Sequence, residues 1–321
     1  MKTIASLLIC YLLSISLSWS QNGEYSFKES YDLATPAKMK ISSSDGNIEV
    51  SAGNTKKAEV LYIVRRNNKV LQISRKELEK ELKVTVLQTG NSLDINVEYP
   101  KIQGFNWKDH MQVSFKITVP KETSCDLITS DGNVSLTGLD LSQQCRTSDG
   151  NIAISSVGGD VIGRTSDGNI SVKQINGAVE ARTSDGNIVA EDIKGNTQSV
   201  TSDGNIVLSH VTGDITISTS DGDIAFTDVA GSVKASSSDG NIRGNILELK
   251  KSLAVRTSDG NISITIPDSM GLDLDIKGES LDVALNNFSG TSDEKYIHGK
   301  INGGGIPVSL TSDGNVSLNY R

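Results

Sequence analysis

The stretch Thr165-Ser166-Asp167-Gly168-Asn169-Ile170 is one copy of the unit on which most of this chain is built. Copies of it place an Asp every 18 residues, at positions 131, 149, 167, 185, 203, 221 and 239. Others follow at Asp259 and, 54 residues or three periods later, at Asp313, and an early copy stands at Asp45. Self-similarity at a fixed period predicts a repeat architecture, because each unit buries its apolar face against the next.

One period contains two short strands and two corners. Asp167-Gly168 and Asn176-Gly177 are tight-turn dipeptides, since Gly accepts positive φ and Asp or Asn tolerates it. Over 170–173 and 179–182, apolar and polar residues alternate as in strands with one buried face. We therefore expect an all-β, β-helix-like solenoid with 18-residue coils. Eight coils stacked about 4.8 Å apart would make a rod of roughly 35–40 Å.

The composition agrees with this architecture and limits the partners. Of the 321 residues only 4% are aromatic, which suits a thin core of Ile, Val, Leu and Ala. The formal charge of −8 argues against nucleic acid or an anionic membrane as the main partner.

Residues 1–20 have the form of a signal peptide. Lys2 precedes an apolar stretch at 4–13, and Ser18-Trp19-Ser20 supplies small residues for cleavage before Gln21. We expect export to the periplasm, the cell surface or the extracellular space, with no transmembrane span in the mature chain. A membrane anchor is the alternative, but the apolar stretch is short for one.

The remaining chain divides into three predicted segments. Residues 21–124 form an N-terminal β segment with one short helix, packed on the solenoid. That helix is expected over 74–82, where Ser74 and Glu77 have capping-box spacing. Residues 125–266 form the regular coils. Residues 267–321 form irregular coils and a C-terminal cap, because the end of a solenoid must be shielded.

These features resemble a bacterial family called "putative adhesin", which is otherwise of unknown function. Besides the repeated unit, the resemblance rests on Val119-Pro120 before the first regular coil, on Ile266-Pro267, and on the 301–305 stretch. It implies a right-handed solenoid on an exported protein and a role in adhesion or at the cell surface. It implies no catalytic residues.

Stacking predicts columns of identical turn residues along one edge of the rod. In three successive coils these are Asp149, Gly150, Asn151, Asp167, Gly168, Asn169, Asp185, Gly186 and Asn187. We expect each Asp to bond its own downstream amides and to point into solvent. Calcium is the alternative, since carboxylates about 5 Å apart repel by roughly 1 kcal/mol in water-like surroundings. We expect the Asn amides to bond up and down their column.

A basic row is the first candidate for ligand contact. Arg146, Arg164 and Arg182 stand three residues before the turn Asp and are expected to point outward, on the same face as Lys173 and Glu180. They either screen the acidic column or bind an anionic glycan or surface polymer.

The segment 101–111 is the second candidate. Its Phe105 and Trp107 have rings that could stack on a sugar, or that cap the open end of the solenoid, which is the reading we prefer.

Cys125 and Cys145 are 20 residues apart and are expected on one strand face of neighbouring coils. Export permits a disulfide between them. Two buried thiols are the alternative, because a diagonal pair can exceed the allowed separation.

No arrangement of residues indicates catalysis. None of the three histidines has a Ser or Cys motif nearby, and the Asp column supplies carboxylate pairs by repetition alone. We expect a non-enzymatic exported scaffold or adhesin-like module, without a cofactor, making repetitive polar contacts with a cell-surface glycan or an envelope protein. The alternative is a glycan-binding or polysaccharide-cleaving β-helix protein.

Overall fold

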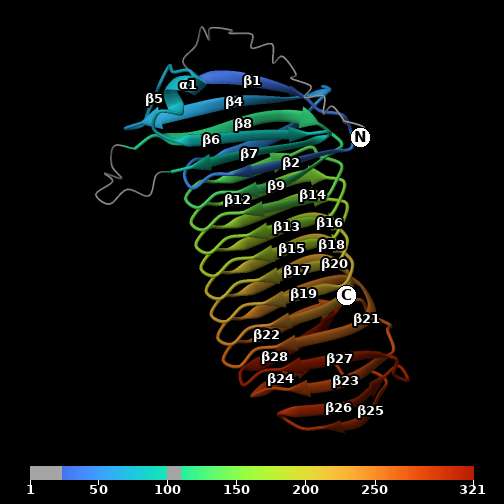
Figure 1. Cartoon of the computed structure of the whole chain (residues 1–321). Helices are drawn as coiled ribbons and strands as arrows, with labels where there is room; N and C mark the ends of the chain where they lie inside the picture. The colour runs from blue at the N-terminus through green and yellow to red at the C-terminus, as the bar shows by residue number, and fades with distance from the viewer. Residues whose placement is uncertain (1–23, 100–109) are drawn as a thin grey trace, which may run out of the picture.

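The computed structural model describes residues 24–99 and 110–321, and these form one elongated stack of strands (Figure 1). Strands of successive coils pair in parallel and in register. Ile152 of β12 (Ile152–Val157) lies opposite Ile170 of β14 (Ile170–Ile175), one period later in the chain. The predicted all-β solenoid with 18-residue coils is confirmed. Its right-handed sense stays a prediction.

Each coil contributes one strand to each of two walls. The first wall contains the strands that follow the Ser-Asp-Gly-Asn turn, and the second wall contains those that precede it. The first wall consists of β3 (Ile48–Gly53), β10 (Val134–Thr137), β12, β14, β16 (Ile188–Lys194), β18 (Ile206–Thr212), the beginnings of β20 (Ile224–Ser236) and β21 (Ile242–Arg256), β22 (Ile262–Ile266) and β28 (Asn315–Tyr320). The second wall consists of β2 (Ala37–Ser42), β9 (Thr123–Ile128), β11 (Gln143–Arg146), β13 (Val161–Arg164), β15 (Val179–Arg182), β17 (Thr197–Val200), β19 (Ile215–Ser218), the ends of β20 and β21, and β27 (Ile306–Thr311).

The early turn unit at Asp45 is a full member of the stack. Met39 of β2 lies opposite Cys125 of β9, and Ile48 of β3 lies opposite Val134 of β10. Residues 37–53 therefore form a coil beside the unit at Asp131, although the chain between them is long. The expected N-terminal segment continues the solenoid at this point and is not merely packed against it, because this copy presents the same strand edges as the later coils.

Antiparallel strands close the N-terminal end beyond this coil. They are β1 (Phe27–Asp32), β4 (Lys57–Arg66), β5 (Lys69–Val70), β6 (Lys83–Thr89), β7 (Ser92–Glu98) and β8 (Gln112–Pro120). β7 and β8 also pair in parallel with β2 and β3. Helix α1 (Arg75–Leu78) is shorter than predicted, but its capping box is present and both Leu78 and Leu82 are buried.

The C-terminal end is built by a detour of the chain. After β22 come β23 (Leu272–Lys277), β24 (Ser280–Val283), β25 (Phe288–Ser292) and β26 (Tyr296–Ile301), at the bottom of Figure 1. The chain then returns, and Ile262 of β22 lies opposite Val316 of β28. The unit at Asp313 therefore stacks directly on the unit at Asp259. Its interpretation as three periods further along was wrong, because part of 267–312 forms antiparallel strands at the end.

The core is a continuous column of inward aliphatic side chains between the walls. In one coil, Ile170, Val172 and Val179 are all buried. Phe226 is one of the few buried rings, and its space comes from the next coil, where a Cβ on Gly244 would lie 2.1 Å from that ring. Apolar burial along the whole stack thus holds the two walls in a fixed relation.

Candidate functional site

A threonine hydroxyl closes each turn of the repeat. The Oγ1 of buried Thr183 lies 2.9 Å from the carbonyl oxygens of Ser166 and Gly168 in the preceding coil. It also accepts a hydrogen bond from the backbone amide of Gly186, at 3.3 Å. The Asp185 amide donates to the Ser166 carbonyl, at 3.0 Å. The prediction that each Asp bonds its own downstream amides was therefore wrong, because the inward hydroxyl takes that role and joins the coils.

Glycine is required in the turn because the coils approach one another closely there. A Cβ on Gly186 would lie 1.9 Å from the carbonyl oxygen of Gly168, and Gly168 stands in the same relation to Gly150. The contact is with backbone, which cannot move aside without separating the coils.

The asparagine side chains form the predicted ladder. The Oδ1 of Asn151 accepts from the backbone amide of Asn169 at 2.8 Å and from its side-chain amide at 3.1 Å. Asp223, the exception in the column, still accepts from the backbone amide of Asn241 at 2.7 Å. The ladder continues through Asn47 and Asn315, so it also ties in the two units that are remote in sequence.

The aspartates along this edge point into solvent, as predicted. Asp149, Asp167 and Asp185 are exposed, one to each coil. Burial, together with the neighbouring Asp45 and Asp149, raises the pKa of Asp131 above its ordinary value. Within the described ranges, no group of three or more His, Cys, Asp or Glu residues is placed to hold a metal ion. This geometry gives the calcium alternative no support.

The three arginines point outward from the second wall and lie side by side. Arg146 is opposite Arg164, and Arg164 is opposite Arg182, on β11, β13 and β15. Glu180 pairs with two of them, with its Oε1 2.7 Å from Arg164 Nη2 and 2.8 Å from Arg182 Nε. The pKa of Glu180 is lowered by these hydrogen bonds, first from Arg182 and then from Arg164. Asp126 lies 4.0 Å from Arg146.

Two expectations about this row need correction. Lys173 also points outward, but it belongs to β14 of the first wall, where it pairs with Glu191 at 2.9 Å. It therefore lies on the other side of the rod from Glu180. The carboxylates that pair with the arginines are those of Glu180 and Asp126 within the second wall, not those of the Asp column.

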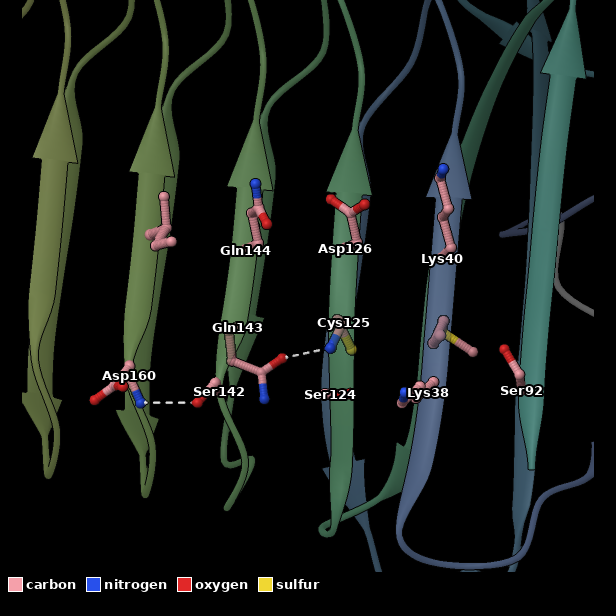
Figure 2. Close-up of a pocket in the computed structure, with 12 residues that line it drawn as sticks. Lys38, Lys40, Ser92, Ser124, Cys125, Asp126, Ser142, Gln143, Gln144 and Asp160 are labelled. Atoms are coloured by element: carbon pink, nitrogen blue, oxygen red, sulfur yellow. Dashed lines mark hydrogen bonds between the residues drawn. The ribbon is translucent and has the colours of Figure 1, made fainter.

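A shallow hollow of about 450 Å³ lies on the same wall, towards the N-terminal end (Figure 2). Lys38 and Lys40 of β2 line it, with Asp126, Gln144 and Asp160 across from them. Lys40 is opposite Asp126 and Asp126 is opposite Gln144 in the strand register. Within the part of the chain that the structure describes, neither lysine ammonium group forms an ion pair or a hydrogen bond.

The sequence did not point to these lysines as site residues. Alternation over 37–41 places them outward, but nothing in the sequence shows that β2 lies beside β9. The hollow and the arginine row together are called the basic wall below: Lys38, Lys40, Arg146, Arg164 and Arg182.

Both cysteines are free thiols and are buried. Cys125 lies opposite Gln143, whereas Cys145 lies opposite Leu127, so the two thiols are diagonal neighbours. Burial raises the pKa of Cys125 to about 12 and also raises that of Cys145.

The other predicted features lie outside the described residues. These are Phe105, Trp107 and the signal peptide at 1–20. Within 24–99 and 110–321, no helix is both long and apolar enough to cross a membrane.

A wound stack of parallel strands, with turn columns that hold the coils together and polar outer walls, defines a β-solenoid repeat protein. The chain belongs to the Toastrack DUF4097 family, whose model matches residues 37–319. No curated protein sequence matches it.

Three solved structures are similar over 92% of this chain. A "putative cell adhesion protein" from Clostridium sporogenes has 12% identity, 99% of its own chain covered and a TM-score of 0.21. A "putative adhesin" from Bacteroides fragilis has 13% identity, 96% coverage and a TM-score of 0.35. A "putative lipid binding protein" from Parabacteroides distasonis has 14% identity, 97% coverage and a TM-score of 0.39. Likenesses of this size carry no inference about function.

Proposed function

We propose that this protein is a non-enzymatic, adhesin-like scaffold that is exported and binds an anionic surface polymer through many weak polar contacts. The observation that carries the proposal is the basic wall, which places five cationic side chains on one side of a chain with a net charge of −8. Regularly spaced weak contacts can add to a useful affinity when one polymer engages several of them.

The partner is inferred from the chemistry of this wall. Lys38 and Lys40 have no anionic partner of their own, so an incoming carboxylate, sulfate or phosphate group would not have to displace an ion pair. Around them stand the hydroxyl groups of Ser92, Ser124 and Ser142, which suit the hydroxyl groups of a saccharide. An anionic glycan fits this combination better than an apolar ligand does.

The absence of catalysis is part of the proposal and is supported by the use of the repeat. The Thr and Asn columns bond one coil to the next, and the Asp column consists of single exposed carboxylates. Export is supported by the signal-peptide form of residues 1–20.

Binding to alginate, a linear polyuronate, tests the proposal, with neutral dextran as the comparison. Serine occupies the arginine position in later coils, at Ser218 and Ser236, so the triple substitution Arg146→Ser, Arg164→Ser and Arg182→Ser suits the fold. We expect it to weaken alginate binding at low salt by about tenfold or more, because each contact is electrostatic.

A matched control removes three cations from the first wall. Lys116→Ser, Lys173→Ser and Arg243→Ser change the net charge equally, and we expect this variant to bind alginate nearly as well as the unaltered protein. Equal losses in the two variants, or equal binding of alginate and dextran, would show that the basic wall is not the contact surface. Release of new reducing ends from alginate would contradict the non-enzymatic part.

A further inference from the structure

Five strands in the described ranges pair with a neighbour on one side only: β1, β5, β6, β24 and β25. Open strand edges invite pairing with other chains, and proteins commonly protect them with charged residues or proline. Four of the five carry such charges, including Glu29 of β1, Lys69 of β5, Lys83 of β6 and Asp282 of β24. Only β25, with the sequence Phe-Ser-Gly-Thr-Ser, has neither a charged residue nor a proline.

The backbone of β25 leaves a regular set of bonding groups on its open side. It runs antiparallel to β26, and Gly290 lies opposite Gly299. On either side of the strand, the Asn302 amide donates to the Asn287 carbonyl and the Asp293 amide donates to the Tyr296 carbonyl. Odd-numbered residues therefore bond towards β26. By the alternation of an antiparallel ladder, the backbone groups of residues 288, 290 and 292 are turned to the open side.

The ring of Phe288 holds this strand on the end of the core. Cβ atoms built on Gly290 and Gly299 would lie 2.9 Å and 2.7 Å from the ring, so the ring covers both glycines on the inner face. Residues 289–292 are exposed. The strand is thus fixed from inside while its outer edge stays accessible.

We propose that β25 is an assembly edge on which a second copy of this chain adds its own β25, joining two rods at their C-terminal ends. Antiparallel pairing about a two-fold axis at Gly290 sets Phe288 opposite Ser292 of the partner subunit. In this register the outward backbone groups of residues 288, 290 and 292 meet the same groups of the second copy.

Charge favours a second copy as the occupant. In this register Asp293 faces Asn287 of the partner subunit, and Glu294 faces Asn286 of the partner subunit, so no like charges meet. A two-fold contact also closes on itself, which limits the assembly to a dimer. The strand is short, so the dimer is weak and reversible, with a dissociation constant of about 0.1–1 mM.

The dimer goes beyond the proposed function and does not depend on it. Two rods joined at one end would present two basic walls and leave both N-terminal ends free. If the dimer forms, a polymer that reaches both walls would be held more tightly than by one rod.

Sedimentation velocity over a range of concentrations tests the proposal, with paired charges placed on the exposed face of β25. Ser289 would lie opposite Thr291 of the partner subunit. Ser289→Glu with Thr291→Glu sets like charges against each other, and we expect the association constant to fall by about tenfold or more. Ser289→Glu with Thr291→Lys sets opposite charges together, and we expect dimerisation to be kept.

A third variant controls for added charge. Thr85→Glu with Leu87→Glu places two carboxylates on β6 at the other end of the rod, where both residues are exposed, and we expect no change in dimerisation. Small-angle scattering should show the dimer at about twice the length of the monomer. A chain that stays monomeric up to about 1 mM, a dimer that is indifferent to the paired carboxylates, or a dimer no longer than the monomer would overturn the proposal.

Discussion

The Oδ1 atom of Asn151 accepts two hydrogen bonds from Asn169 in the next coil, one from its backbone amide at 2.8 Å and one from its side chain at 3.1 Å. The relation recurs along the rod, so a side chain supplies the acceptor that a backbone carbonyl would supply in a sheet. The corner of the solenoid is thereby bonded from coil to coil, although it is not a strand.

This relation predicts different costs for two substitutions of one residue. Asn169→Ala removes the acceptor of the Asn187 amide and should lower the free energy of unfolding by about 1–2 kcal/mol. Asn169→Asp keeps an acceptor, as Asp223 does in its own coil, and should cost less. Urea denaturation of the two variants checks this order. Equal losses would show that the ladder does not depend on the oxygen.

The threonine hydroxyl should matter more, because it is buried and joins three backbone groups. Thr183→Val keeps the shape but leaves those groups without a partner, and we expect a loss of about 2–4 kcal/mol. Thr183→Ser is the matched control, because Ser237 makes the equivalent contacts at 3.0–3.1 Å in its coil. It should cost about 1 kcal/mol or less. If the Ser and Val variants unfold together, the hydroxyl is not the clamp.

The close approach of the coils predicts that the turn glycines cannot be replaced. Gly186→Ala would put a Cβ into the Gly168 carbonyl, and we expect a loss of more than about 3 kcal/mol. Gly303→Ala is a useful contrast, because that glycine has φ +85° but no heavy atom within 4 Å of its built Cβ. It should cost only about 1–2 kcal/mol from backbone strain. Thermal unfolding compares the two, and a similar shift in both would contradict the steric account.

The buried cysteines should be almost unreactive in the folded protein. Burial raises the pKa of Cys125 to about 12 and raises that of Cys145, so at pH 8 little thiolate is present and it is shielded from reagents. A thiol-specific disulfide reagent should label neither cysteine in native protein and both in urea. Rapid labelling of the native protein would contradict the burial. No labelling in urea would indicate a disulfide.

The sequence was sufficient for features that repeat and insufficient for contacts between distant segments. The period located the turn at Asp167 and the outward direction of Arg164, because alternation around a fixed corner sets both. The inward Thr183 was placed correctly by the same alternation. Its bonds to Ser166 and Gly168 were missed, because they depend on how closely the coils approach.

Segments that leave the repeat could not be placed from the sequence. The stacking of the Asp313 unit on the Asp259 unit depends on the chain detour between them, and irregular strands carry no period. The same limit hid Lys38 and Lys40, because the neighbour of β2 lies more than eighty residues further along the chain.

The central claim is that each 18-residue unit is an interchangeable coil, and removal of one coil tests it most directly. Deleting 185–202 joins Ser184 to Asp203 and restores the turn phrase, whereas deleting only 185–193 leaves half a coil. We predict that the whole-coil variant keeps its β-sheet circular dichroism and cooperative unfolding, in a rod shorter by about 4.8 Å, and that the half-coil variant loses both. A whole-coil variant that unfolds as readily as the half-coil variant would contradict the account.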